Sequence, residues 1–279
     1  MRTLLKRLYR ERRRLSVVAA VTFLGGFLAF YKSSTVVFGI PMPILAGLAF
    51  MFGLTAFLMG LVVLFPSIRH SAESVALSIP VLSLMGVFSS TDEGGLSTST
   101  SIYGLLLAYL FMTVYAGAWV DKYLPRRPHT FRSRALSKLR REELWPYLTV
   151  TPDTVDTYGS ENTISMEWIE PGVSFREVER SGDLAKVEEV ATIEANEANS
   201  HYRKAFVVAD ATENAPVSSG YYEVKLSNGG PGTYLETVRE FDRVTIRARL
   251  FTWIDDAFGR QDDLYIQQAE RAVQSSQAA

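Results

Sequence analysis

The sequence predicts an α-helical transmembrane bundle of about four spans, followed by an α+β domain whose antiparallel sheet wraps on a long C-terminal helix. Three patterns carry this prediction. The first half of the 279-residue chain contains four long stretches without Asp, Glu, Lys or Arg. The second half contains short β-like runs separated by turn residues, and its last segment repeats apolar residues every three or four positions.

Charge divides the chain at the same place. Residues 1–130 contain 12 Lys and Arg against 5 Asp and Glu, whereas residues 131–279 contain 17 against 25. The absence of Cys excludes a disulfide framework, iron–sulfur ligation and a cysteine nucleophile. His70, His129 and His201 lie far apart in sequence, so we expect no metal site. The acidic second half also argues against a nucleic-acid partner.

The predicted membrane domain covers residues 15–121, after a basic N-terminal segment at 1–14. A spanning helix needs about 20 mostly apolar residues. The four predicted spans are 15–31, 42–66, 74–90 and 101–121. The third is the weakest, because it contains five Ser and Pro80; it is either a span inside the bundle or a re-entrant segment. The small-residue pairs Ala49/Gly53 and Ala56/Gly60 predict close helix approach.

Basic residues flank both ends of this domain. Seven Lys and Arg precede the first span, and five lie in residues 122–134 after the fourth. The positive-inside rule therefore favours an even number of spans with both termini cytoplasmic, whereas three spans would place 122–134 outside. A cleaved signal peptide is the alternative interpretation of the N-terminal segment. No small-x-small cleavage site follows the first apolar run, so we expect an uncleaved anchor. The expected location is a bacterial inner membrane.

The second half predicts one α+β domain at 130–279, joined by a linker at 122–129. A first strand is expected at 131–139 and a short helix at 140–148, with Leu144 and Trp145 facing inward. Residues 220–226 alternate strictly, as in a strand with two distinct faces. Six further strands are expected, at 163–169, 173–178, 184–193, 202–209, 220–226 and 233–241. From 244 to 276 the apolar spacing predicts one long helix, with Gly259 as the place for a bend.

This order of elements resembles the helix-grip domains of the START-like superfamily, also called SRPBCC or polyketide cyclase/dehydratase-like. Residues 142–148, EELWPYL, resemble the Trp-containing early helix of that family. Residues 168–175, WIEPGVSF, resemble its first hairpin, and Gly232-Thr233 resembles the start of its penultimate strand. The resemblance covers about residues 130–276 and leaves out the membrane part.

The resemblance implies a deep cavity between sheet and helix that holds an apolar ligand, such as a lipid, an isoprenoid or a polyketide-like molecule. Each inward residue would serve equally well as a core residue of a small domain. The ligand-binding candidates are Trp168, Phe175, Phe206, Tyr222, Leu250, Trp253 and Ala257. No catalytic motif is carried over, and no cofactor or metal is expected.

Three functions remain open at this point. The first is a membrane-anchored, cytoplasmic-facing domain that binds or senses an apolar ligand, with the bilayer and that small molecule as partners. The second is a cyclase- or dehydratase-like enzyme, whose cavity would need a polar pair. The candidates for that pair are Glu177, Tyr222, Arg203 and Glu236. The third is a subunit or assembly factor of a membrane protein complex. An open apolar cavity favours the first, and convergent polar groups with shifted pKa values favour the second. A filled core with an exposed apolar patch favours the third.

Overall fold

Two units with separate cores make up the chain, Met1–Tyr123 and Leu124–Ala279. The computed structural model describes residues 2–64, 71–84, 118–152, 163–181, 185–210, 218–230 and 232–278, together with Leu106, Leu107, Leu110, Thr154 and Tyr158.

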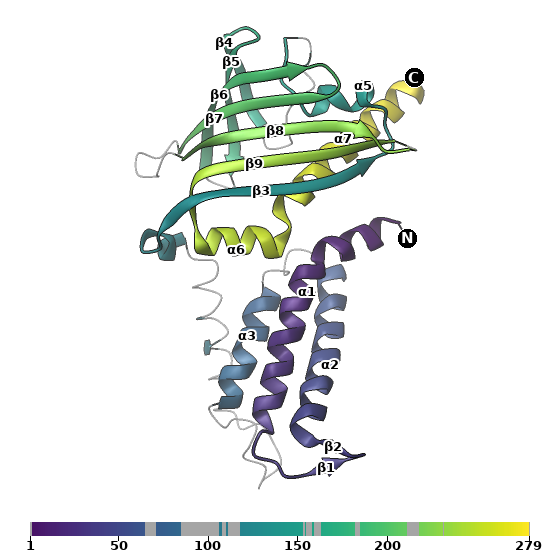
Figure 1. Cartoon of the computed structure of the whole chain (residues 1–279), viewed down its shortest axis with the longest axis vertical. Coiled ribbons are helices and arrows are strands. Elements are labelled where there is room, and N and C mark those ends of the chain that lie inside the picture. Colours follow the sequence, from purple (N-terminus) through teal and green to yellow (C-terminus); the bar gives the residue numbers. More distant parts are fainter. Residues whose placement is uncertain are drawn as a thin grey trace. The chain divides into compact units, whose positions relative to one another are not determined.

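The N-terminal unit contains three described helices (Figure 1). These are α1 (Arg2–Ala29), α2 (Met42–Leu64) and α3 (Ser71–Leu84), with a short hairpin of β1 (Val36–Val37) and β2 (Ile40–Pro41) between α1 and α2. The helix α1 packs against both α2 and α3. Val18, Leu58 and Ala76 form the buried contact between them.

Glycines of α1 allow the three helices to approach closely. A Cβ on Gly25 would meet the side chain of Ile79, and one on Gly26 would meet the carbonyl oxygen of Ala46. By contrast, a Cβ on Gly53 or Gly60 would meet no described atom within 4 Å. Among the described residues, close approach therefore runs through Gly25, Gly26 and also Gly47 of α2, where a Cβ would meet Phe23, whereas Gly53 and Gly60 have no such described neighbour.

Only part of the predicted membrane domain can be compared with the structure. Within the described residues, Met42–Gly60 is long and apolar enough to cross a membrane, with a mean hydropathy of 2.0. The first predicted span lies in α1, which begins already at Arg2, so the basic segment and the span form one helix. The third is helical as far as Leu84, and its remainder lies outside the described residues. Most of the fourth lies outside them too, so the number of spans stays a prediction.

The C-terminal unit consists of a seven-stranded antiparallel sheet and several helices. After the 3-10 helix η2 (Ala118–Lys122), its elements follow in one order. They are β3 (Arg126–Ser137), α5 (Arg141–Leu144), η3 (Trp145–Tyr147), β4 (Thr163–Glu170), β5 (Ser174–Ser181), β6 (Ala185–Glu197), β7 (His201–Asp210), β8 (Ser218–Asn228), β9 (Thr233–Thr245), α6 (Ile246–Asp255) and α7 (Ala257–Ala278).

The strands lie in the order β3-β9-β8-β7-β6-β5-β4. Strands β4 to β9 pair as consecutive hairpins, and the first strand, β3, closes the sheet by pairing with the last. The sheet curves, and α7 crosses one face of it (Figure 1). This is the helix-grip arrangement that the sequence predicted, and all six predicted β-like runs are strands.

Two boundaries differ from the prediction. Strand β3 begins at Arg126, inside the expected linker, because Arg126 pairs with Thr245 at the far end of β9. The expected long helix is two helices, and the break lies at Asp256 rather than at Gly259. Asp256 has a left-handed conformation with φ of 45°, which Asp tolerates better than most residues.

The core of this unit lies between the sheet and α7. Ile266 and Ala269 of α7 are buried against Val224 of β8 and Leu235 of β9. Leu144 and Trp145 are buried as predicted, and the Trp145 ring meets the Tyr202 ring edge-on at 6.5 Å between centroids. Inward residues alternate along each strand, as one buried face requires. The same alternation positions the site described next.

Candidate functional site

A cavity of about 140 Å³ lies between the sheet and α7. Strands β5 to β9 supply one wall, and the first half of α7 supplies the other. The lining residues are Tyr158, Glu177, Glu179, Glu189, Lys204, Phe206, Val208, Tyr222, Arg239, Phe241, Phe258, Gln261 and Tyr265. The lining therefore combines charged groups, tyrosine hydroxyls and aromatic rings.

One end of the cavity holds the carboxylate–lysine cluster, which consists of Glu177, Glu179, Glu189 and Lys204. The register brings it together, since Glu177 of β5 lies directly opposite Glu189 of β6. Lys204 Nζ on β7 lies 2.5 Å from Glu189 Oε1 and 3.9 Å from Glu177 Oε2. Burial alone would lower the pKa of Lys204, but the carboxylates of Glu189 and Glu177 raise it above its usual value. Lys204 is thus a fixed cation.

The three carboxyl groups outnumber this cation. Burial raises the pKa of Glu177 to about 7, against the opposing effect of Lys204 and with further raising by Glu179 and Glu189. Burial and the nearby Glu189 also raise the pKa of Glu179. Thr163 Oγ1 donates a hydrogen bond to Glu177 Oε1 at 3.1 Å. Glu177 therefore titrates close to neutral pH, where a proton donor or acceptor is most useful.

A second buried ion pair forms the opposite part of the wall. Arg239 Nη2 donates to Asp262 Oδ1 at 2.8 Å, and Asp262 is wholly buried. Thr237 Oγ1 donates to Asp262 Oδ2 at 2.7 Å, and Ser133 Oγ bonds the same oxygen. The Arg239 guanidinium lies 4.8 Å from the ring centroids of both Tyr222 and Phe258. Asp262 thus neutralises Arg239 within a satisfied network.

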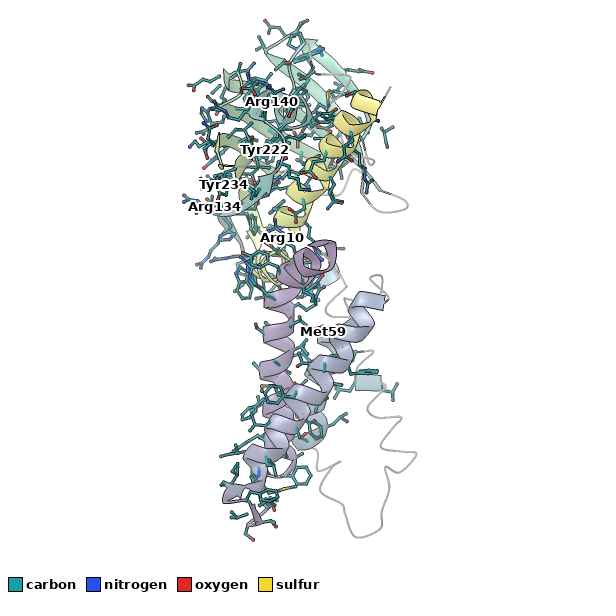
Figure 2. The ribbon with its side chains drawn as sticks, turned by 90° about the vertical axis from the view of Figure 1, so that its right-hand side faces the viewer. Arg10, Met59, Arg134, Arg140, Tyr222 and Tyr234 are labelled. Carbon is teal, nitrogen blue, oxygen red and sulfur yellow. The ribbon has the colours of Figure 1, made fainter. Side chains whose placement is uncertain are left out.

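Tyrosine hydroxyls supply neutral hydrogen-bonding groups. Burial raises the pKa of Tyr265 to about 12 and raises the pKa values of Tyr158 and Tyr222 as well. Gln261 Nε2 donates to the Tyr265 hydroxyl at 3.1 Å. Tyr222, labelled in Figure 2, lies directly opposite both Lys204 and Arg239 in the sheet. These phenols stay protonated at neutral pH.

The other end of the cavity is its aromatic end, which consists of Phe206, Phe241 and Phe258. The Phe241 ring lies 5.4 Å from that of Phe206 and stacks on that of Phe258 at 5.9 Å. Gly220 lies between Phe206 and Phe241 in the register, and a Cβ there would meet the Glu240 carbonyl and the Phe206 ring. Because Gly220 has no side chain, the two rings can meet. Val208 adds a further apolar side chain to the lining.

The structure distributes the seven predicted ligand-binding residues over three places. Phe206 and Tyr222 line the cavity. Trp168 and Phe175 pack edge to face at 5.9 Å within the core. Leu250 and Trp253 lie half-exposed on α6, and Ala257 begins α7 one residue before the lining residue Phe258. The last three lie outside the lining because the expected single helix is interrupted at Asp256.

The four candidates for a polar pair also separate. Glu177 and Tyr222 line the cavity. Arg203 lies on the other face of β7, where its Nε is 2.7 Å from Glu194 Oε2. Glu236 is bound at 3.0 Å by Arg134, which is 80 % exposed. Two of the four therefore contribute to the site.

Sequence reasoning missed Glu179, Glu189, Lys204, Arg239 and Tyr265. The signal was present in the period-two alternation. Lys204 lies two residues from the inward Tyr202 and Phe206, and Arg239 continues the inward series of Leu235 and Thr237. Isolated charges at inward positions of a strand indicate a buried polar site. Among the described residues, no cluster of His, Asp and Glu is arranged to hold a metal ion.

A variant tests the raised pKa of Glu177. The pKa of this carboxyl rises from 4.5 to about 7 on folding, so the folded state favours its protonated form. The contribution of that form to stability is fully present below pH 4.5 and is lost as the pH rises through 7. We therefore expect Glu177→Gln to raise the free energy of unfolding at pH 8 by up to about 3 kcal/mol, and to give no gain at pH 4. Chemical denaturation at both pH values measures this. Glu188→Gln, on the half-exposed Glu188–Arg176 pair, is the control, and equal effects of the two variants would contradict the assignment.

Comparisons with known proteins place the chain near several solved structures of low identity. A conserved protein from Geobacillus kaustophilus is 12 % identical with a TM-score of 0.42, over 53 % of this chain and 97 % of that one. Protein Mll3558 from Rhizobium loti is 17 % identical with a TM-score of 0.36, over 53 % and 97 %. Ara h 8.0201 is 16 % identical with a TM-score of 0.38, over 53 % and 99 %. No protein-family model and no curated protein matches the chain.

Proposed function

We propose that the C-terminal unit binds one compact amphiphilic molecule in the cavity between its sheet and α7, and that the N-terminal unit anchors it to a membrane. The observation that carries this proposal is the convergence of the carboxylate–lysine cluster and the aromatic end on one cavity. Such a cavity with a few convergent polar groups and perturbed pKa values is the default form of a small-molecule site.

The size of the cavity limits the ligand. Pockets for drug-sized ligands measure roughly 300–1,000 Å³, whereas this cavity measures about 140 Å³. A cavity of about 150 Å³ in another protein holds one benzene molecule. The ligand that fits is therefore close to one ring or a short chain in size. A whole lipid or sterol would require the sheet and α7 to separate.

The lining sets the chemistry of the ligand. The aromatic end favours a flat apolar body, while the tyrosine hydroxyls and the cluster favour a hydrogen-bonding or cationic group. A cationic group would compensate the excess of carboxyls over Lys204. This is a more polar ligand than the apolar molecule that the resemblance implied, because Glu177, Glu189 and Lys204 are isolated charges at inward strand positions.

The membrane anchor is supported by composition. The apolar helix segment Met42–Gly60 and the basic residues on both flanks of 15–121 favour four spans with both termini on the cytoplasmic face of a bacterial inner membrane. Tethering raises the effective concentration of the domain near ligands dissolved in the bilayer. An amphiphile that partitions into the headgroup region is such a ligand.

Native mass spectrometry of the detergent-purified full chain tests the proposal. We expect one small molecule retained per chain, released on unfolding and identified from its mass and fragments. A ligand with a ring or short apolar body and one polar or basic group would match the lining. A chain without bound small molecules, which also gains none when incubated with small aromatic amines and alcohols, would contradict it.

A second candidate function is acid–base catalysis in the same cavity. The observation that favours it is Glu177, a buried carboxyl with a pKa of about 7. General acids and bases work best when the pKa lies near the operating pH. The test is conversion of the retained molecule: Glu177→Gln should abolish turnover while retaining the ligand. If the unmodified chain retains the molecule without converting it, the catalytic function is contradicted and only the binding function is supported.

A further inference from the structure

The helix α6 carries an apolar stripe on its exposed side. Ile246 is 65 % exposed, Leu250 50 % and Trp253 48 %. Their spacing of four and three residues places them on one face of the helix. Ile254, on the adjoining face beside Leu250, is only 5 % exposed, because that face of α6 packs against β3 and β9. Single exposed apolar residues are ordinary, but a continuous stripe that includes Trp is typical of an interaction surface.

Arginines surround this stripe. Arg249 is exposed between Ile246 and Leu250, and Arg243 is 61 % exposed just before the helix. Arg126 and Arg127 are exposed at the start of β3, where they pair with Thr245 and Val244. The helix therefore presents apolar side chains within a basic surface.

Two acidic residues lie near the stripe. Asp242 accepts hydrogen bonds from the backbone and hydroxyl of Ser219 and from the hydroxyl of Ser218, and its Oδ2 also lies 3.9 Å from Arg243 Nε. Asp255 forms an ion pair with Arg260 of α7. Arg126, Arg127 and Arg249 remain in excess of these two pairs and give this edge a net positive charge. That charge complements an anionic partner.

The edge is also where the chain enters the C-terminal unit. Leu124 is the first residue of the unit, and Arg126 pairs with Thr245, whose hydroxyl caps α6 by accepting from the Ala248 N–H at 3.1 Å. The stripe therefore lies at the edge that is covalently joined to the membrane anchor proposed above. A bilayer is the partner that this connection keeps within reach.

We propose that the exposed stripe of α6 (Ile246, Leu250 and Trp253) binds the surface of an anionic lipid bilayer. The apolar side chains enter the boundary between headgroups and acyl chains, and Trp253 occupies the depth that Trp favours at interfaces. Arg126, Arg127, Arg243 and Arg249 bind the phosphates. This inference rests on the membrane anchor in the proposed function, and it is independent of what the cavity binds.

Single cysteines test the inference cleanly, because the chain has no native Cys. Leu250→Cys and the control Val207→Cys are each labelled with a nitroxide in the full chain. Val207 is 45 % exposed on β7 and so matches Leu250 in exposure. The chain is placed in nanodiscs of phosphatidylcholine alone or mixed equally with phosphatidylglycerol. Power saturation then measures the accessibility of each label to oxygen and to a water-soluble nickel chelate.

We expect the label at 250 to gain oxygen accessibility and lose nickel accessibility in the anionic discs, while the label at 207 does not change. Each arginine near an anionic surface is worth about fivefold in binding, so Arg243→Gln with Arg249→Gln should reverse most of the change at 250. A chain that co-elutes with the discs, but whose label at 250 stays as accessible to nickel as that at 207, overturns this inference alone. Immobilisation at 250 that is equal in both lipids and in detergent indicates a protein partner and also overturns it. A chain that does not co-elute with the discs overturns the anchor and this inference together.

Discussion

Replacing Lys204 by Met is expected to destabilise the C-terminal unit by about 3–5 kcal/mol at neutral pH, the usual cost of removing one partner from a buried ion pair. Lys204 is buried, and its ammonium is the one described cation within 4 Å of the Glu177 and Glu189 carboxylates. Without it, these carboxylates must either stay charged in a low-dielectric site or take up protons. Both cost free energy at neutral pH.

The sign of the pH dependence follows from the same reasoning. Acid protonates the carboxyls that are left without Lys204. The loss of unfolding free energy in Lys204→Met should therefore become smaller as the pH falls from 8 to 5. Denaturant unfolding followed by tryptophan fluorescence measures it. Lys225→Met is the matched control, because Lys225 is 56 % exposed and pairs with Glu223 at 2.9 Å; its loss should be about 0–1 kcal/mol. A Lys204→Met defect as small as that of the control, or one that does not depend on pH, would refute the role given to the cluster.

Replacing Asp262 by Ala is expected to cost a similar 3–5 kcal/mol, because it leaves the buried Arg239 guanidinium without its counterion. Ser133 and Thr237 lose an acceptor in the same change. The double variant Arg239→Met with Asp262→Leu should recover part of the loss, since replacing both ions with apolar side chains is often tolerated.

The control for this pair lies on an exposed part of the sheet. Glu236→Ala removes the Glu236–Arg134 pair, in which Arg134 is 80 % exposed, and should change stability by about 0–1 kcal/mol. Thermal unfolding of the parent and of the three variants provides the comparison. A double variant that is at least as unstable as Asp262→Ala would show that the cost arises from something other than the unpaired Arg239 charge.

The fold of the C-terminal unit could be predicted because local signals agree there with tertiary structure. Turn residues such as Glu170-Pro171-Gly172 separate the strands, and strict alternation in β8 defines its two faces. The break at Asp256 could not be predicted, because nothing in the apolar spacing of 244–276 reports a left-handed residue. That break sets α6 apart from α7, which explains why Leu250 and Trp253 lie half-exposed rather than beside the cavity.

The site was predictable in position more than in chemistry. Phe206 and Tyr222 were accessible to sequence reasoning as large inward residues of strands. Lys204 was accessible only as an isolated charge at an inward strand position. Its pairing with Glu189 was not, because it depends on the register between β6 and β7, which a single sequence does not specify. Glu177 entered only as a candidate for a polar pair, and its shifted pKa arises from burial that the alternation alone does not measure.

The most direct test of the central claim, that the cavity binds a small molecule, is ligand retention in a pair of adjacent valine variants. Val208 lines the cavity, whereas Val207 is 45 % exposed on the same strand. Native mass spectrometry of the full chain should show the bound molecule in the parent and in Val207→Trp, and no bound molecule in Val208→Trp. Val208→Phe, which adds less volume, should retain part of it and guards against misfolding of the larger variant. A Val208→Trp protein that keeps the molecule as fully as Val207→Trp would contradict the account.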